Sequence, residues 1–138
     1  MPPQTATYGT VQIWNVYNLT ADAHPMHVHL FNVMVLRRRP FNVANFTGIP
    51  AFTGPGVGPD ANETGWKATA RMMPGECTTV AVLVEHPLPT GYVDVPQTAG
   101  GTVRSTLPTS PRTGGHEYVW HCHILEHEEH DMMHAMVG

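Results

Sequence analysis

Apolar and polar residues alternate most regularly between positions 76 and 85 of the chain. Thr78, Val80, Val82 and Val84 share one parity, so an extended backbone places all four side chains on the same face. β-Branched residues also favour strands, because their stiff side chains pack well on a pleated surface. The pattern therefore predicts a strand over 76–85 with that face turned towards a core.

Similar signals predict the rest of the secondary structure. Further strands are expected over 10–19, 28–36, 66–71, 116–123 and 132–137, which carry β-branched, aromatic or other apolar residues. Pro25 cannot donate a hydrogen bond to a neighbouring strand, so we expect a turn at 20–25 and a break beside His24. Residues 124–131 are expected to make one or two helical turns that bring His127 back beside Cys122.

Glycine and proline, with 13 of each, gather between these segments. Residues 40–65 are expected to form a long loop, and 86–115 have the Pro-, Thr-, Gly- and Ser-rich composition of a linker. Residues 1–9 are interpreted as a loose leader, and His86 as a surface residue. Helical patterns are few, so the 138 residues are expected to fold as one all-β domain.

The charge of the chain is slight, with seven Lys and Arg against eleven Asp and Glu. We therefore expect no nucleic-acid partner and no attraction to an anionic membrane. Arg37, Arg38 and Arg39 are interpreted as a solvated strand end rather than an anion site. No apolar run approaches the roughly 18 residues of a membrane span, and the N-terminal residues lack the apolar core of a signal peptide.

Histidine is the unusual component of this composition. Six of the ten histidines lie between 116 and 134, and three lie between 24 and 29. In a strand over 118–123, Cys122 points to one face while His121 and His123 point to the other. His27 and His29 have the same spacing, so the two pairs are expected to meet across a sheet. Clusters with such spacing are typical of metal sites.

A second group of soft ligands follows the same strand. His127 comes five residues after Cys122, and Met132 five residues after His127. One thiolate, two imidazoles and a weakly bound thioether are the ligands of a blue copper site. The second imidazole has to come from elsewhere, and the cluster at 24–29 supplies it.

Three other roles fit these residues less well. A Cys77–Cys122 disulfide would remove the thiolate that the flanking histidines favour as a ligand, so Cys77 is expected to be a free, buried thiol. The stretch from His123 to His127 matches the H-x-x-E-H pattern of some zinc peptidases, but it leaves Cys122 unused and few residues for a third ligand. A structural zinc site would leave four paired histidines without a role.

The chain resembles the C-terminal cupredoxin domain of multicopper oxidases, most closely the laccase and bilirubin oxidase branch that includes spore-coat laccases. The matching runs are HPMHVHL (24–30), RRPF (38–41), TGP (53–55), GWK (65–67) and WHCHILEHEEHDMM (120–133). The resemblance implies that 1–138 form a cupredoxin-like Greek-key β-sandwich with a short helix after the His-Cys-His strand. About six strands are recognisable where the family has seven or eight, so the first strands are expected to be missing.

The resemblance also assigns individual residues. It implies that type 1 copper is bound by His24, Cys122, His127 and Met132. It implies that a trinuclear copper cluster is bound in part by His27, His29, His121 and His123. Glu128 is implied as a proton donor to bound oxygen, which completes a catalytic set of Glu128, Cys122, His121 and His123.

Members of this family take single electrons at type 1 copper and pass them through His-Cys-His to the cluster, which reduces O2 to water. The cluster uses eight histidines, and the resemblance implies that this domain supplies four. We therefore expect a partner, either an N-terminal oxidase chain or domain or a homo-oligomer. The reducing substrate is expected to be a small aromatic compound or a metal ion, and the location secreted, extracellular or periplasmic.

A non-enzymatic blue copper electron-transfer protein is the alternative interpretation. It would need only the type 1 ligands and would leave the two paired histidine motifs unexplained. Ala68 stands where relatives usually have an acid, and the segment 86–115 replaces a short turn of the family. Three Asn-x-Thr triplets, at Asn18, Asn45 and Asn62, weakly indicate a secreted source.

Overall fold

The computed structural model describes residues 4–7, 9–85, 92–96, 102–106, 111–114, 117–130 and 132–137. The elements in these ranges are β1 (Gln4–Thr5), β2 (Thr10–Tyr17), β3 (His24–Val28), β4 (Asn32–Pro40), a 3-10 helix (Ala61–Glu63), β5 (Thr69–Met72), β6 (Glu76–Val84), β7 (Tyr92–Pro96), β8 (Thr102–Thr106), β9 (Glu117–Cys122), α1 (Leu125–Glu129) and β10 (Met133–Val137).

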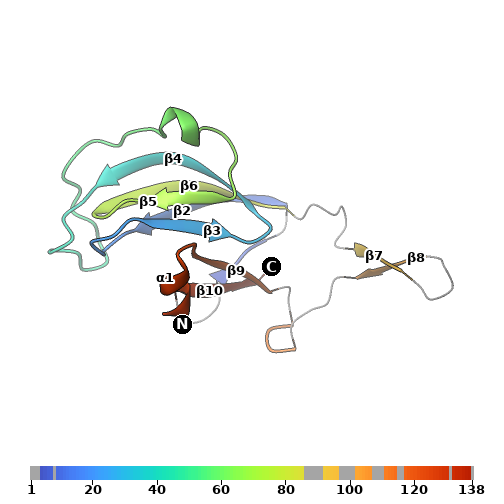
Figure 1. Cartoon of the computed structure of the whole chain (residues 1–138). Helices are drawn as coiled ribbons and strands as arrows, with labels where there is room; N and C mark the ends of the chain where they lie inside the picture. Colours follow the sequence, from blue (N-terminus) through green and yellow to red (C-terminus); the bar gives the residue numbers. More distant parts are fainter. Residues whose placement is uncertain are drawn as a thin grey trace.

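Two sheets pack face to face around the core (Figure 1). One has the strand order β1-β10-β9-β3-β5 and the other β2-β6-β4, and all neighbours are antiparallel except β1 and β10. Val80, Val82 and Val84 of β6 are at most 2% exposed, as the alternation predicted. The expected all-β sandwich is confirmed, and α1 follows the His-Cys-His strand as expected.

The expected turn at 20–25 is present at 20–22, where the chain bends, but its last two residues belong to β3. The strand begins at His24, contains Pro25 and pairs with both β5 and β9. Pro25 is tolerated because it lies beyond the Met26–Cys122 pair that ends the β9 ladder, and its carbonyl still accepts the His123 N–H at 2.7 Å. The expected strand over 28–36 is also divided, because Leu30 turns the chain with a φ of 64° between β3 and β4.

The N-terminal residues do not form only a loose leader. Gln4 and Thr5 form β1, which pairs in parallel with Met136 and Val137. The Ala6 N–H donates to the Val137 carbonyl at 2.7 Å, and Ala6 is buried. The described residues therefore place eight strands in the two sheets, where the sequence indicated about six.

Part of the segment 86–115 has regular structure that its composition did not predict. β7 and β8 form an antiparallel ladder of their own, in which Tyr92 pairs with Thr106 and Pro96 with Thr102. His86 lies outside the described residues.

Asn18 joins the end of β2 to the turn between β5 and β6. Its N–H donates to the Glu76 carbonyl and its own carbonyl accepts the Gly75 N–H. The side-chain amide donates to the carbonyls of Asp22 (2.7 Å) and Met72 (3.1 Å), and the residue is only 5% exposed. The first Asn-x-Thr triplet is therefore a structural element rather than an accessible glycosylation site.

Arg38 is buried and paired, which corrects the solvated strand end expected at 37–39. Its guanidinium donates to both carboxylate oxygens of Glu63, at 2.6 and 2.9 Å, and to the Arg71 carbonyl. Glu63 belongs to the 3-10 helix, so this bidentate pair holds the long loop after β4 against the sheet. The hydrogen bonds from Arg38 lower the pKa of Glu63, with burial as a smaller opposing cause.

We expect Glu63→Gln to lower the free energy of unfolding at pH 7 by about 2 kcal/mol, the usual size for a hydrogen bond to a charged group. The Glu63 carboxyl has a lower pKa in the folded state than its unfolded value of about 4.3. Its contribution is therefore complete above the unfolded pKa and is lost as the pH falls through the folded pKa. Urea unfolding across pH 3 to 7 should show the variant and the wild type converging in acid, while the exposed Glu85→Gln control follows the wild type throughout. A constant difference at every pH would contradict this role of the ion pair.

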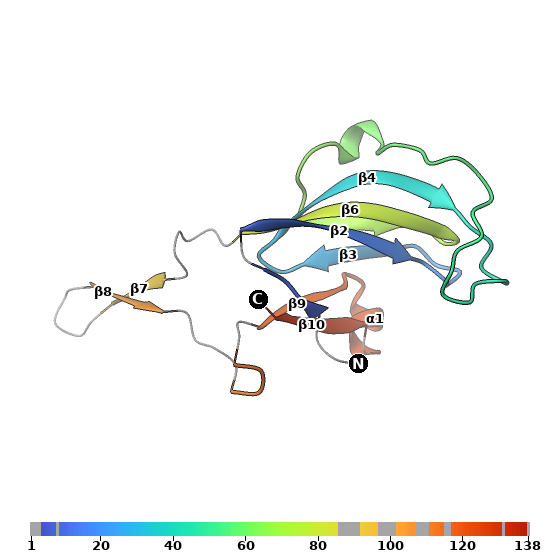
Figure 2. The ribbon, with the colours of Figure 1, turned by 180° about the vertical axis from the view of Figure 1, so that it is seen from behind.

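The three-stranded sheet has β2 at one edge and β4 at the other (Figure 2). β2 carries Val11 and Ile13 with more than half of their surface exposed.

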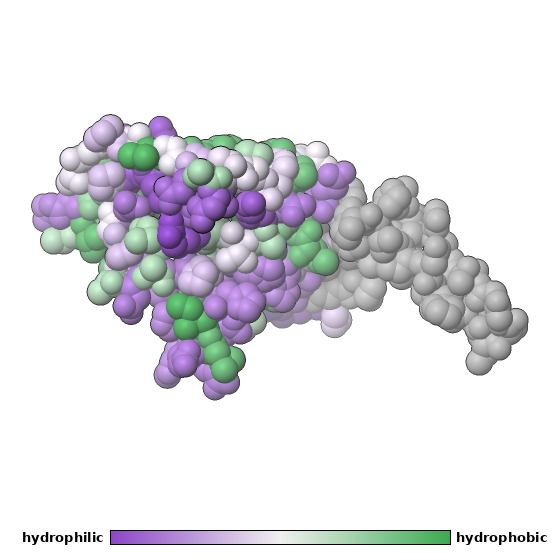
Figure 3. Space-filling model, turned by 45° about the horizontal axis from the view of Figure 1, so that its top comes forward, coloured by the Kyte–Doolittle hydropathy of each residue, from purple (hydrophilic) through white to green (hydrophobic). Residues whose placement is uncertain are grey.

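On the face seen in Figure 3, hydrophilic residues gather near the middle and apolar residues are interspersed around them. In the described part of the chain, no helix has the length and apolar character needed to span a membrane.

Candidate metal centre

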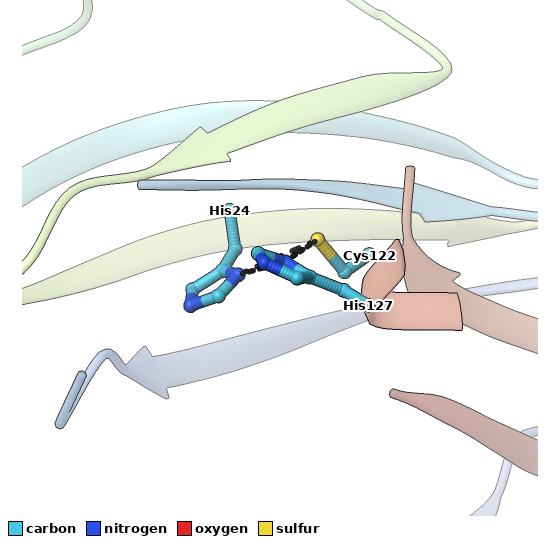
Figure 4. A group of neighbouring side chains, drawn as sticks. All are labelled: His24, Cys122 and His127. Carbon is cyan, nitrogen blue, oxygen red and sulfur yellow. Dashed lines mark hydrogen bonds between the residues drawn. The ribbon is translucent and has the colours of Figure 1, made fainter. Parts of the chain in front are cut away.

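Three ligand-type side chains converge at the end of β9, from three different elements (Figure 4). His24 begins β3, Cys122 ends β9 and His127 lies in α1. The Cys122 Sγ lies 3.4 Å from the Nδ1 of each histidine, and the two Nδ1 atoms are 3.1 Å apart. The sequence predicted this triad, and the structure brings it together.

The triad fits a metal ion in size and in donor type. A point equidistant from the three atoms lies about 1.9 Å from each, close to the roughly 2.0–2.3 Å of metal–imidazole and metal–thiolate bonds. A thiolate with two imidazoles suits copper or zinc and is poorly suited to magnesium or calcium.

Burial shapes the protonation of these ligands. Cys122 is fully buried and His24 is 6% exposed. Burial raises the pKa of the Cys122 thiol, so an incoming metal has to displace a proton. Burial lowers the pKa of His24, and the neighbouring His127 lowers it further, which favours the neutral, metal-binding form of that imidazole.

Met132 is tied to this triad through its backbone. Its N–H donates to the His127 carbonyl and its carbonyl accepts the Cys122 N–H, both at 3.1 Å. The side chain is half-buried and packs against the core. These bonds hold Met132 beside two of the three ligand residues, and its role as axial ligand stays a prediction.

Four histidines gather on the opposite face of β3 and β9. The register pairs His27 directly with His121, and strand alternation puts His29 and His123 on the same side. Ring centroids of neighbouring histidines in this quartet are 5.0 to 5.5 Å apart. The same alternation separates His24 from His27 and His29, so the break expected beside His24 is not needed.

Three members of the quartet have nitrogens that converge. Ligand atoms of His27, His29 and His121 lie within 4.8 Å of one another, and the His29 and His121 Nε2 atoms are 3.0 Å apart. The Nδ1 of His27 donates to the Ala68 carbonyl at 2.9 Å, and the Nδ1 of His121 faces the Cys122 carbonyl at 3.0 Å. Carbonyl oxygens can only accept, so the Nε2 of both rings is left to bind a metal.

His123 and Glu128 lie at the margin of this group. His123 has an exposed side chain and is not among the three converging ligands, although its ring contacts those of His27 and His121. A Glu128 carboxylate oxygen lies 3.1 Å from the His121 Nδ1 and 3.9 Å from the His123 Nδ1. Glu128 thus contacts both histidines that flank Cys122.

The structure also decides between the other roles considered for these residues. Cys77 and Cys122 are both free and buried, so they form no disulfide. His123 precedes α1 and does not share a helix with His127, so the zinc-peptidase motif lacks its required geometry. His134 lies against the Trp120 ring and outside both groups of ligands.

Sequence reasoning missed two groups that hold these histidines. The Thr20 hydroxyl lies 2.7 Å from the His24 Nε2, and the Ala68 carbonyl binds His27. A backbone carbonyl leaves no trace in the residue type, so Ala68 gave no signal. Thr20 lies four residues before His24 in a turn rich in polar residues, where its composition indicated only the turn.

Comparisons with known proteins agree with this geometry. A model of the multicopper oxidase family matches residues 1–138. The laccase of Bacillus subtilis (strain 168) is 39% identical over 135 residues, and the match covers 96% of this chain and 21% of that protein. The laccase of Bacillus stratosphericus is 35% identical, and the match covers 93% of this chain and 20% of that protein. The crystal structure of the McoA multicopper oxidase from Aquifex aeolicus superimposes with a TM-score of 0.58 at 28% identity, covering 97% of this chain and 20% of that one. The chain thus spans about a fifth of the length of these relatives.

Proposed function

Because this chain belongs to the multicopper oxidase family, we propose that it serves as the electron-accepting domain of a laccase-like oxidase that reduces O2 to water. One observation carries the proposal: Cys122 faces the triad while the adjacent His121 faces the quartet. Copper at the two sites would supply one-electron transfer and the reduction of O2. The chain itself would contribute a covalent path of one peptide bond between a ligand of each site.

The quartet would form half of the trinuclear cluster. His29 is exposed and the His123 side chain is 63% exposed, so the outer side of the quartet is open to ligands from another domain or chain. The limited coverage of the relatives supports an N-terminal oxidase domain or chain as that partner, with a homo-oligomer as the other source. A simple electron carrier would need the triad alone, and the convergence of His27, His29 and His121 argues against it.

The reducing substrate and the location are proposed from the resemblance to laccases rather than from a contact within this chain. We propose a small aromatic compound or a metal ion as the electron donor. We propose a secreted, extracellular or periplasmic location for the protein.

Glu128 is proposed to deliver protons to the oxygen-reducing side. Reduction of O2 to water consumes protons, and the Glu128 carboxylate lies within 3.1 Å of a quartet imidazole. The carboxylate is half-buried, so it can exchange protons with solvent and still face the quartet.

We expect Glu128→Gln to keep the blue colour of the copper-loaded protein and to slow oxygen consumption roughly a hundredfold in the assembled oxidase. The loss should grow as pH rises, because solvent protons replace the missing carboxyl only in acid. Absorption spectra and oxygen consumption across pH on the same copper-loaded samples provide the measurement. The exposed neighbour Glu129 supplies the matched control, Glu129→Gln, which should follow the wild type. Wild-type turnover by Glu128→Gln at every pH would remove Glu128 from the mechanism, and a colourless copper-loaded wild type would refute the type 1 site.

A further inference from the structure

The loop between β2 and β3 makes a directed chain of hydrogen bonds that ends on a metal-binding histidine. The Thr20 hydroxyl lies 2.7 Å from the Nε2 of His24, whose Nδ1 faces Cys122 and His127. In the described residues, the Nε2 of His127 has no such partner. The two imidazoles of the triad are therefore held differently, and only His24 is fixed by a side chain outside the triad.

The direction of each bond in this chain can be assigned from Asn18. The carbonyls of Asp22 and Met72 can only accept, so the nitrogen of the Asn18 amide must face them. The Asn18 oxygen is then an acceptor, and it receives the Thr20 N–H at 3.0 Å and the Thr20 hydroxyl at 2.7 Å. The Thr20 hydroxyl also has the Asp22 carbonyl as an acceptor, at 3.2 Å. Both oxygens can only accept, so with its proton given to either of them the Thr20 oxygen offers lone pairs to its other neighbours.

One of those neighbours is the His24 ring. A neutral imidazole carries a single N–H, and the Thr20 oxygen is placed to accept it from Nε2. That tautomer leaves the Nδ1 lone pair pointing at the triad, where a metal needs it. Through Thr20, the acceptors Asn18 and Asp22 thus favour the tautomer of His24 whose Nδ1 is free to bind.

We propose that Thr20, oriented by Asn18, is a positioning residue that fixes the tautomer and orientation of His24 at the type 1 site. The inference rests on the proposed copper function of the triad. When the His24 Nε2–H donates a hydrogen bond to the Thr20 oxygen, the imidazole becomes a better electron donor to the metal, and this favours Cu(II) over the less charged Cu(I). Thr20 therefore acts to tighten Cu(II) binding and to lower the reduction potential of the site.

The test compares variants of Thr20 in the complete chain. Thr20→Val removes the hydroxyl and keeps the shape of the side chain. Thr20→Ala removes both the hydroxyl and the methyl group, and Thr20→Ser keeps the hydroxyl. Thr64→Val is the control, because the Thr64 hydroxyl also bonds a local carbonyl but lies far from the histidines in sequence and in an exposed turn. Copper-loaded proteins are compared by Cu(II) competition titration, redox titration and visible and paramagnetic resonance spectra, with circular dichroism as the check on folding.

We expect Thr20→Val and Thr20→Ala to stay folded and blue, to bind Cu(II) roughly tenfold more weakly, and to show an altered resonance spectrum. If Cu(I) binding is unchanged, a tenfold loss for Cu(II) raises the one-electron potential by about 59 mV. Thr20→Ser and Thr64→Val should match the wild type. Wild-type affinity and potential in Thr20→Val, or an equal loss in Thr20→Ser, would overturn the inference while leaving the copper function intact. A wild type that binds copper without colour would instead refute the copper function itself.

Discussion

Cys122→Ser should abolish the intense visible band of the copper-loaded protein and weaken copper binding more than roughly a hundredfold. The colour of a blue copper site comes from a bond between thiolate and copper, and a serine hydroxyl cannot replace that bond. Cys122 is the only sulfur in the triad and is fully buried between two imidazoles. Copper titration with absorption spectroscopy measures both effects.

The second thiol provides a control for this substitution. Cys77 is also free and buried, and it lies on β6 outside both groups of ligands. Cys77→Ala should lose some stability, because it removes buried volume, and should keep the colour and copper affinity. A strong visible band in Cys122→Ser, or its loss in a folded Cys77→Ala, would contradict the assignment of the thiolate.

The isolated chain should bind one copper ion firmly and consume no oxygen above the level of free copper. The triad is complete within the chain, whereas the quartet supplies only four of the eight imidazoles that a trinuclear cluster of this family uses. Activity should appear when a second set of histidines is added, through an N-terminal oxidase chain or through self-association. Light scattering, copper counting and oxygen consumption on the same sample measure the three quantities together.

Two histidine variants make this experiment specific. His29→Ala should remove oxygen consumption from the assembled protein and leave the blue band, because His29 belongs to the quartet alone. His130→Ala should leave both unchanged, because His130 is exposed and belongs to neither group. A strictly monomeric chain that binds four copper ions and reduces O2 to water would refute the half-cluster interpretation.

Local periodicity was sufficient to predict the faces of the site. A period of two places Cys122 and His121 on opposite sides of any strand, so two separate groups of ligands were expected from the spacing, while the members of each group came from the family resemblance. The strand over 76–85 was predicted for the same reason. Each of these inferences depends on neighbours in sequence, and the structure confirms them.

The predictions from sequence fail where segments that are distant in the chain meet. Pro25 is allowed in β3 because β9, almost a hundred residues later, ends beside it. Arg38 is buried because the loop returns Glu63 to it. Neither pairing leaves a pattern in the local sequence, so rules for isolated segments extended the turn as far as Pro25 and predicted a solvated strand end. The Thr20 contact to His24 is short in sequence but depends on the direction of hydrogen bonds, which residue types alone do not fix.

The sharing of β3 and β9 by both groups of ligands also determines where this domain can be redesigned. Inserting or deleting a single residue inside either strand would exchange the two faces, moving the thiolate to the quartet and a histidine to the triad. Length changes are therefore incompatible with the strands, whereas the loop between β4 and β5 contributes no residue to either group of ligands. Directed evolution towards other electron donors should therefore keep the lengths of β3 and β9 and vary only side chains in these two strands.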